Sequence, residues 1–277
     1  MSTYYTLQNG TLQQTSNMMD DRGLAYGDGF FSTLGVRGGR ILWLDLHKQR
    51  FNQGAKQLAL TLDVNNLANQ LNTLAGDITD GIIKVIITRQ AQAVRGYGFV
   101  DNTAVIHIKS SAMPIYQDVS FISDFPIQAP MQASCLSAQV GIRPPRFAGL
   151  KLISSHEQIF AHQELLQKQI TNPALGEGLV TNVDKLWISG TMSNVYYRLD
   201  DAWYTPFVDK SGVNGVARQA VLAMGQVSQR HLKDDDLPHI TGLFFSNAVR
   251  GIMPVQGLWL DDVLISLNPD IYKECFT

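Results

Sequence analysis

The first half of the chain carries the hydrophobic patterns of a small sheet with two helices. Apolar residues recur at helical spacing in residues 45–60 and again in residues 65–75, which predicts two amphipathic helices. Residues 81–89 are rich in β-branched side chains, a pattern typical of a buried strand. The other predicted elements are a hairpin over residues 4–12, turned by Asn9-Gly10, and strands at residues 30–36, 40–44 and 102–109.

The second half predicts more strands than helices. A helical pattern covers residues 155–171, with Ser154 and Ser155 as candidate N-caps. A second helix is predicted over residues 216–229, opened by the glycine-rich stretch 212–215. The remaining pattern predicts strands at residues 119–123, 133–141, 178–181, 186–190, 194–198 and 242–246, and a turn at 247–251.

These elements predict an α/β protein with mixed sheets and two domains, because 277 residues exceed an ordinary single core. The segment containing Pro114 lacks a regular pattern, which indicates a connector. We therefore expect a small N-terminal α/β domain over residues 1–110, a linker over 111–118, and a larger C-terminal α/β domain over 119–277.

Composition narrows the class of protein. A formal net charge of -2 and a pI near 6.3 give no basic surface for nucleic acid. Cys135 and Cys275 follow no metal-ligand spacing, so we expect reduced thiols and no metal site. No apolar run approaches about 18 residues and the first residues lack a signal-peptide pattern, so we expect a soluble, cytoplasmic protein with no membrane partner.

Lys151 is the first candidate for chemistry. It is the only charged residue in the apolar stretch 147–153. Apolar surroundings remove water from an ammonium group and lower its pKa, which makes a better nucleophile or Schiff-base partner. The alternative is a lysine that extends its charged end from a half-buried strand.

Two other features suit an anion. His47 and Arg50 lie three residues apart on a predicted helix, so they project from the same side. Residues 212–215 precede a predicted helix, and glycine-rich helix starts present backbone N–H groups to phosphates. The alternatives are a solvated charge on the helix face and an ordinary turn.

Short motifs follow one another in a fixed order along the chain. Arg50, in His47-Lys48-Gln49-Arg50, comes before Lys151, and three motifs follow Lys151: Asn194-Val195-Tyr196, Tyr204-Thr205-Pro206 and Gly215-Val216-Ala217-Arg218. In this order, from Asp21 to Val255, the chain resembles the fold-type IV, pyridoxal-phosphate-dependent family. That family comprises branched-chain aminotransferases, D-amino acid aminotransferases and aminodeoxychorismate lyases.

The resemblance implies the two-domain fold of D-amino acid aminotransferase and pyridoxal 5′-phosphate as the cofactor. Lys151 matches the lysine that forms a Schiff base with the cofactor, and Arg50 matches the arginine that binds its phosphate. It also implies a small-molecule substrate and a homodimer. The cofactor-binding residues that it implies are Arg50, Lys151, Ser189, Met192, Ser193, Asn194, Gly215, Val216, Asn247 and Ala248.

Ser189 departs from the family pattern. Five residues before the position of Asn194, the family has a glutamate that pairs with the cofactor's ring nitrogen. A glutamate keeps that nitrogen protonated and the ring a strong electron sink, as transamination requires. A neutral hydroxyl gives a weaker sink, which elimination tolerates because the leaving group takes up the electrons. The departure argues against an aminotransferase, is compatible with a lyase, and also allows a catalytically impaired relative.

Within the family, the chain most resembles aminodeoxychorismate lyase, on residues 28–33, 88–89, 95–97, 246–248 and 253–255. This implies conversion of 4-amino-4-deoxychorismate to 4-aminobenzoate and pyruvate, a step of folate biosynthesis, with Lys151 also acting as general base. Arg95, Arg250 and Tyr97 are candidates for binding the two substrate carboxylates. Thr33 is a candidate for assisting proton transfer, the alternative being an ordinary β-branched strand residue.

Three functional hypotheses follow from the sequence. The first is a lyase that makes 4-aminobenzoate. The second is an aminotransferase of D-amino acids or branched-chain amino acids. The third is a catalytically impaired relative that binds a ligand without turnover, which the presence of both Lys151 and Arg50 argues against.

Overall fold

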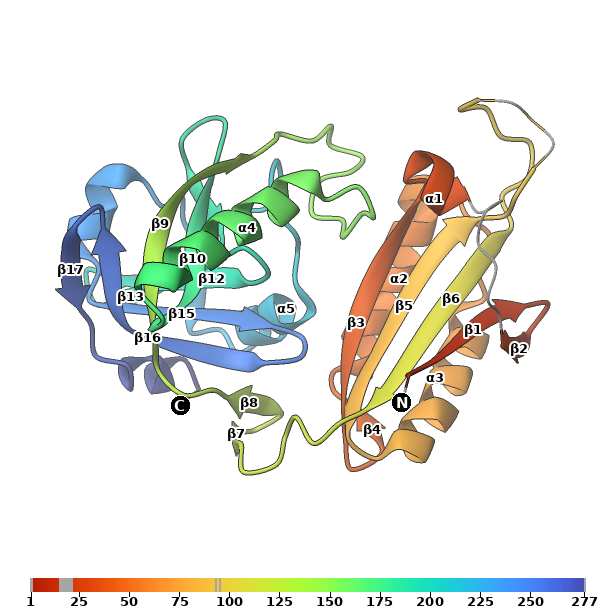
Figure 1. Ribbon diagram of the computed structural model, residues 1–277, viewed down its shortest axis with the longest axis horizontal. Coiled ribbons are helices and arrows are strands. Elements are labelled where there is room, and N and C mark those ends of the chain that lie inside the picture. Colours follow the sequence, from red (N-terminus) through yellow and green to blue (C-terminus); the bar gives the residue numbers. More distant parts are fainter. Residues whose placement is uncertain (1, 15–21, 93, 95, 277) are drawn as a thin grey trace. The chain divides into compact units, whose positions relative to one another are not determined.

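The computed structural model describes residues 2–14, 22–92, 94 and 96–276. By its contacts the chain separates into two compact units. Unit 1 comprises Met1–Asp118 and Leu150–Ser154, and unit 2 comprises Val119–Gly149 and Ser155–Thr277. In Figure 1 most of unit 1 is red to yellow, and unit 2 is mainly green to blue.

Unit 1 is built on an antiparallel sheet whose described strands follow the order β2-β1-β6-β5-β3-β4. The predicted hairpin is confirmed: Asn9 and Gly10 join β1 to β2 with φ of 52° and 76°. Positive φ at both central residues is what a type I′ turn requires. The strands are β1 (Ser2–Gln8), β2 (Thr11–Gln14), β3 (Gly29–Arg37), β4 (Arg40–Ile41), β5 (Gly81–Arg89) and β6 (Ala104–Ala112).

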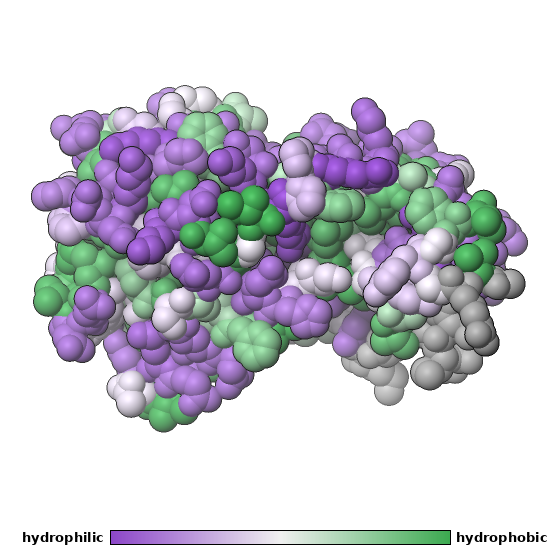
Figure 2. All heavy atoms as spheres, turned by 90° about the horizontal axis from the view of Figure 1, so that it is seen from above, coloured by the Kyte–Doolittle hydropathy of each residue, from purple (hydrophilic) through white to green (hydrophobic). Residues whose placement is uncertain are grey.

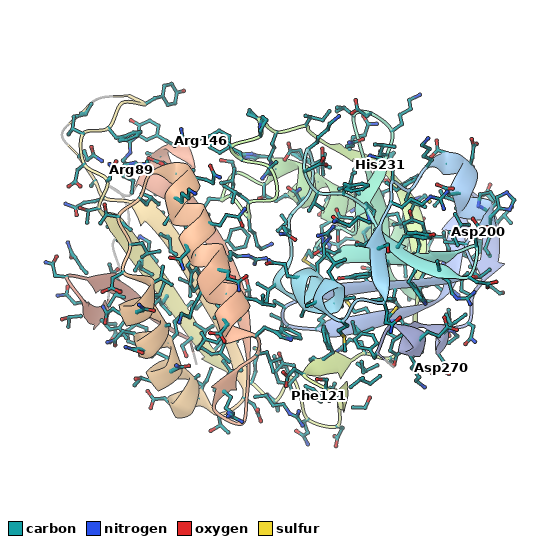
Figure 3. The ribbon with its side chains drawn as sticks, turned by 180° about the vertical axis from the view of Figure 1, so that it is seen from behind. Arg89, Phe121, Arg146, Asp200, His231 and Asp270 are labelled. Atoms are coloured by element: carbon teal, nitrogen blue, oxygen red, sulfur yellow. The ribbon has the colours of Figure 1, made fainter. Side chains whose placement is uncertain are left out.

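Helices α2 (Leu44–Leu58) and α3 (Val64–Ile78) cover one face of this sheet (Figures 1 and 3), and a short helix α1 (Arg22–Tyr26) precedes β3. Alternate residues of β3 point to the covered face, where Phe30 and Leu34 pack with Phe51 of α2 and Leu67 of α3. The intervening residues of β3, including Thr33, therefore point to the face that these helices leave open.

Unit 2 contains a large mixed sheet with the order β11-β10-β9-β16-β15-β12-β13-β14. β9 runs parallel to both of its neighbours, β10 and β16. The strands are β7 (Ser120–Ile122), β8 (Phe125–Ile127), β9 (Met131–Val140), β10 (Leu175–Asn182), β11 (Trp187–Ser189), β12 (Asn194–Leu199), β13 (Ala202–Thr205), β14 (Val227–Gln229), β15 (Gly242–Asn247), β16 (Gly251–Leu260) and β17 (Val263–Ser266).

Helix α4 (His156–Thr171) packs on β9 and β10, where it buries Ala161 and Leu165 against Leu136 and Val140 (Figure 1). Its N-cap is Ser155, as predicted. Helix α5 (Val216–Ala223) lies in the same unit. Two short 3₁₀ helices, η1 (Asp234–His239) and η2 (Ile271–Phe276), complete the elements of unit 2 in the described part of the chain.

The predicted helix over residues 216–229 was wrong in its second half. Helix α5 ends at Ala223, and Gly225 follows with φ of 83°, a left-handed conformation that terminates helices. Residues Val227–Gln229 instead form β14, which pairs in parallel with β13. The pairing with a distant strand therefore decides the structure of this segment, and its local helical pattern does not.

The face of the molecule in Figure 2 shows mainly hydrophilic residues with several separate hydrophobic patches. Over the ranges that the structure describes, no helix is both long enough and apolar enough to cross a membrane. The same residues contain no group of three or more His, Cys, Asp or Glu side chains arranged to hold a metal ion.

The expected C-terminal domain contained Lys151, and the expected linker covered residues 111–118. By contacts, the segment Leu150–Ser154 groups with unit 1, and unit 1 continues to Asp118. β6 extends to Ala112, so the first two residues of the expected linker belong to the sheet.

Candidate active site

Lys151 lies in a short extended segment that pairs with the edge of β3. The Phe31 N–H donates to the Lys151 carbonyl at 2.9 Å, and the Ile153 N–H donates to the Gly29 carbonyl at 3.2 Å. Leu152 packs against the core of unit 1. Because side chains alternate along an extended segment, Lys151 points to the open face of the sheet. There its Nζ lies 4.5 Å from the centre of the Phe31 ring.

Two glycines, one just before β3 and one at its first residue, permit this pairing. A Cβ on Gly29 would collide with the Ile87 carbonyl and lie 2.7 Å from the Ile153 side chain. Gly27 has φ of 65°, and a Cβ there would collide with the Ser154 hydroxyl. These two glycines of the sequence therefore let the lysine segment approach the edge of β3 closely.

Arg50 belongs to a buried cluster on the helix-covered face. Its Nη1 donates to the Ser32 hydroxyl at 3.2 Å, and that hydroxyl lies 2.8 Å from Nδ1 of His47, one turn earlier on α2. The tautomer of His47 decides whether the hydroxyl donates to Nδ1 or accepts from it. His47 Nε2 is buried and has no hydrogen-bond partner among the described residues.

Burial changes the pKa of both basic groups. It lowers the pKa of Arg50 to about 10, so the guanidinium is still charged at neutral pH. Burial, followed by the nearby charge of Arg50, lowers the pKa of His47 well below 6.5. Arg50 is 8% exposed, so the alternative of a solvated helix-face charge does not apply. A buried guanidinium beside neutral polar groups is well suited to bind an anion.

Acidification is expected to destabilise the wild-type protein through His47. The unfolded chain takes up a proton near pH 6.5 and the folded protein only at lower pH, so stability falls as the pH drops below 6.5. The loss is at most about 1.4 kcal/mol per pH unit. His47→Gln lacks the titrating group, so its unfolding free energy should fall less between about pH 7 and pH 5 in urea titrations.

His239→Gln is the matched control, because it removes an exposed histidine in unit 2. This variant should keep the wild-type dependence on pH. Equal losses of stability in wild type and His47→Gln on acidification would contradict a neutral, buried His47.

A buried carboxylate shapes the turn after Ser189. Glu177 on β10 is 3% exposed. Its Oε1 accepts from the backbone N–H and the hydroxyl of Thr191 at 2.9 and 2.6 Å, and its Oε2 accepts from the Ser193 hydroxyl at 2.6 Å. A Cβ on Gly190 would lie 2.8 Å from the carboxyl carbon. Sequence analysis missed Glu177, although a lone acidic residue beside a predicted apolar strand was a signal for it.

Ser189 itself is available to a ligand. It is the last residue of β11, is 7% exposed, and pairs through its backbone with Val180 of β10. Its hydroxyl makes no hydrogen bond within the described ranges of the chain. A hydroxyl without a protein partner can accept or donate a hydrogen bond when a polar ligand atom reaches it.

Asn194 connects the turn after Ser189 to the start of helix α5. Its Nδ2 donates to the Val213 carbonyl at 2.8 Å. Gly215 is the N-cap of α5, and a Cβ there would collide with Oδ1 of Asn194. The first N–H groups of a helix have no acceptor within the helix and attract anions. Met192 and Ser193, which directly precede Asn194, and Gly215 and Val216 are therefore brought to one helix start.

The predicted turn after β15 lies in the same region of unit 2. Ser246 pairs in register with Asn194, between β15 and β12. Oδ1 of Asn247 accepts from two backbone N–H groups of the turn, at 3.0 and 2.8 Å. This arrangement confirms the predicted turn and places Asn247 and Ala248 next to the strand that begins with Asn194. The Arg250 side chain is exposed.

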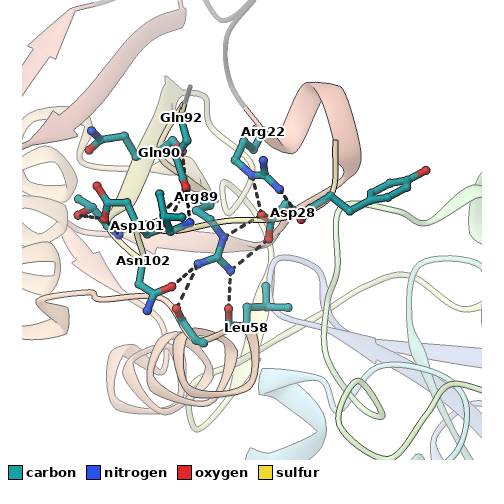
Figure 4. A network of polar contacts seen from close by, with 12 residues as sticks. Arg22, Asp28, Leu58, Arg89, Gln90, Gln92, Asp101 and Asn102 are labelled. Atoms are coloured by element: carbon teal, nitrogen blue, oxygen red, sulfur yellow. Dashed lines mark hydrogen bonds and ion pairs between the residues drawn. The ribbon is translucent and has the colours of Figure 1, made fainter. Parts of the chain in front are cut away.

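Arg22, Asp28 and Arg89 form a network of ion pairs next to the loop that contains Tyr97 (Figure 4). The Nε atoms of Arg22 and Arg89 donate to Oδ2 of Asp28 at 3.0 and 2.9 Å. Arg22 Nη2 also donates to the Tyr97 carbonyl at 3.1 Å, which fixes the loop backbone. The Tyr97 side chain is 86% exposed. Arg95 lies outside the described residues, so its role stays a prediction.

Sequence analysis missed Lys84, on the open face of the sheet. Lys84 of β5 pairs in register with Thr33 of β3 and with Lys109 of β6, and opposed residues share a face. Lys84 Nζ lies 5.3 Å from the centre of the Phe31 ring, the ring that Lys151 also contacts. None of the residues that share this face in β3, β5 and β6 is acidic. Alternation along the predicted strand 81–89 was the signal for Lys84.

The chain belongs to the amino-transferase class IV family, whose model matches residues 29–258. Membership implies pyridoxal phosphate as the cofactor and an enzyme that acts on a small molecule. The chain is 26% identical to the aminodeoxychorismate lyase of Vibrio harveyi over 261 residues, covering 89% of each. It is 24% identical to the aminodeoxychorismate lyase of Bacillus subtilis, covering 90% of this chain and 78% of that protein.

Solved structures agree with this assignment. The 4-amino-4-deoxychorismate lyase of Pseudomonas aeruginosa matches with a TM-score of 0.80 and 26% identity, covering 98% of both chains. The branched-chain amino acid aminotransferase of Escherichia coli matches with a TM-score of 0.78 at 15% identity, covering 98% of this chain and 92% of that one, and shows the fold alone. The predicted fold class, a mixed α/β fold of fold-type IV, is confirmed.

Proposed function

We propose that the protein is a pyridoxal-phosphate-dependent lyase that converts 4-amino-4-deoxychorismate to 4-aminobenzoate and pyruvate. The observation that carries this proposal is Ser189, a residue that is 7% exposed and whose hydroxyl has no partner in the described residues, at the position of the family glutamate. Two relatives and one similar solved structure bear the name of an aminodeoxychorismate lyase, which supports the choice within the family.

The residues present fit the cofactor. A phosphate dianion requires an arginine fork and several backbone N–H groups. Arg50 is the arginine proposed for this role, and in unit 2 the first N–H groups of α5 have no acceptor within the helix. Asn247 and Ala248 are proposed as further contacts of the cofactor. The Ser189 hydroxyl is free to bond the ring nitrogen. When bound, the cofactor draws electrons from the carbon next to the substrate nitrogen, which makes its proton removable.

Lys151 has two proposed tasks. Its amine would hold the cofactor covalently. Its Nζ, in the neutral form, takes the proton from the carbon that bears the substrate nitrogen. Backbone pairing with β3 directs Nζ to the open face, beside Phe31. Thr33 lies on that face and is proposed to assist the proton transfer.

Ser189 suits elimination in particular. The electron pair of the broken C–H bond enters the six-membered ring as the bond from the ring to the enolpyruvyl oxygen breaks. The ring becomes aromatic, and the leaving group takes up a proton to give pyruvate. Because the leaving group accepts the electrons, this reaction depends less on a protonated ring nitrogen than transamination does.

The substrate's two carboxylates require cations. Lys84 shares the open face with Thr33 and Phe31, so we propose that it binds one carboxylate. Arg250 and Arg95 are proposed for the other, with Tyr97 as a hydrogen-bond donor.

We also propose a homodimer, consistent with the exposed apolar side chains of Leu24, Tyr26, Tyr97 and Val100 in unit 1. Sedimentation velocity would test this proposal.

The proposal is tested by incubating the purified protein and pyridoxal phosphate with 4-amino-4-deoxychorismate. We expect pyruvate and 4-aminobenzoate in equal amounts. Lys84→Met should raise KM about 10-fold, through loss of one charge-assisted contact, and leave kcat within about 3-fold. Lys56→Met is the control, because Lys56 is exposed in the last turn of α2.

Two results would reject the proposal. Amino-group transfer from D-alanine to a 2-oxo acid, without pyruvate release from aminodeoxychorismate, would identify an aminotransferase. The relative of Bacillus licheniformis named D-alanine aminotransferase, 24% identical, makes this the second candidate. Binding of the cofactor with neither activity would identify a catalytically impaired relative.

A further inference from the structure

Arg218 is a buried cation at the start of helix α5. It is the third residue of the helix and is 3% exposed. Its guanidinium extends back toward the loop before the helix, where Nη1 donates to Oδ1 of Asn214 at 3.1 Å. Nη2 donates to the Pro206 carbonyl at 2.9 Å and to Oε1 of Gln229 at 2.7 Å. All three acceptors are neutral.

No carboxylate compensates this charge. Among the described residues, Arg218 forms no ion pair, and its Nε is buried without a hydrogen-bond partner. Burial lowers the pKa of Arg218, as expected for a cation removed from water. Arg22 and Arg89 are also buried, but both form ion pairs with Asp28, unlike Arg218.

The uncompensated charge lies next to the part of α5 that attracts anions. Asn214, which Arg218 contacts, directly precedes the N-cap Gly215. The first N–H groups of the helix and its dipole give the same region a positive potential. The guanidinium, which contacts the residue before the N-cap, adds a full positive charge, and its burial weakens screening by water.

We propose that Arg218 supplies the buried charge of a phosphate-binding site at the start of α5. It acts as a positioning residue, because it also fixes the loop at Asn214 through its hydrogen bond. Two positive contributions at one helix start favour a dianion, such as a phosphate monoester, over a carboxylate. That this phosphate belongs to pyridoxal phosphate rests on the proposed function.

Gln229→Glu provides the sharpest test. The substitution keeps the size and the hydrogen bond of Gln229, but places a carboxylate 2.7 Å from the Arg218 guanidinium. We expect a higher melting temperature of the protein without cofactor, because the buried cation gains a counter-ion. The dissociation constant of pyridoxal phosphate should rise about 10-fold, because that charge is then neutralised. Gln163→Glu makes the same charge change at an exposed position of α4. It should alter neither the melting temperature nor the dissociation constant.

Arg218→Met is the second variant, since methionine is long, flexible and uncharged. It should weaken pyridoxal phosphate binding about 10-fold and leave the binding of pyridoxal, which lacks the phosphate, within about 2-fold. Inorganic phosphate should raise the melting temperature of wild type more than that of the variant. A purely structural Arg218 predicts a lower melting temperature with both affinities unchanged.

The outcomes separate this inference from the proposed function. Wild type that binds inorganic phosphate but not pyridoxal phosphate would reject the cofactor assignment and leave the phosphate site supported. Wild-type affinity for pyridoxal phosphate in both Gln229→Glu and Arg218→Met would overturn the inference and leave the cofactor assignment intact. Wild type that binds neither ligand would overturn both.

Discussion

Lys151→Ala should abolish pyruvate release, lowering kcat by about 10⁴-fold, because one side chain both holds the cofactor covalently and moves the proton. Backbone pairing with β3 involves the carbonyl of residue 151, not its side chain, so the segment should remain in place. The variant should still bind pyridoxal phosphate through the phosphate-binding groups. Borohydride treatment followed by peptide mass spectrometry should attach the cofactor to Lys151 in wild type and to no residue in the variant.

Lys56→Ala serves as the control, since Lys56 is exposed on α2. It should retain wild-type turnover and the cofactor attached to Lys151. A Lys151→Ala protein that keeps a tenth or more of the wild-type kcat would remove Lys151 from the chemistry. In that case the alternative, a lysine that extends its charged end from a half-buried strand, would explain the position.

Arg50→Met should weaken pyridoxal phosphate binding by about 100-fold, the second-largest effect we expect. A guanidinium that bonds a phosphate through two N–H groups contributes roughly 1.5–3 kcal/mol per charge-assisted bond. Turnover should recover at saturating cofactor, because Arg50 has no role in proton transfer. Fluorescence titration with pyridoxal phosphate measures the dissociation constant, and steady-state assays at two cofactor concentrations measure the recovery.

Lys48→Met is the control for Arg50, because it removes a partly exposed charge from the same turn of α2. It should change the dissociation constant by no more than about 2-fold. Ser32→Ala, which removes one neighbour of the guanidinium, should have a smaller effect than Arg50→Met. Unchanged cofactor affinity in Arg50→Met would mean that the buried arginine is structural.

Local patterns in the sequence predicted the features that depend on neighbouring residues. Asn9-Gly10 specified a hairpin because few other dipeptides adopt positive φ twice. The sequence offered a half-buried strand only as the alternative for Lys151, and the structure places Leu152 against the core with Lys151 Nζ beside Phe31. The family resemblance implied that Asn194 and Gly215 lie at one helix start. Local periodicity could not predict this, because the two residues are far apart in the sequence.

Features that depend on pairing between distant residues were not predicted. Glu177 stabilises the turn at Thr191 and Ser193, but only the register of β10 with β11 brings them together. Lys84 joins the open face through its register with Thr33. The end of α5 at Ala223 reflects pairing of the next strand with β13. The register between strands that are distant in the sequence cannot be inferred from the local patterns of one sequence.

The pairing of β3 with Leu150–Ser154 has a consequence during synthesis of the chain on the ribosome. Residues 1–118 emerge first and contain every strand of the first sheet, but the edge of β3 at Gly29 and Phe31 finds its partner only when residue 154 has been made. Until then, that edge has unpaired N–H and C=O groups. The N-terminal unit therefore completes its fold after translation of the second unit has begun, and a fragment that ends at Asp118 lacks both that partner and Lys151.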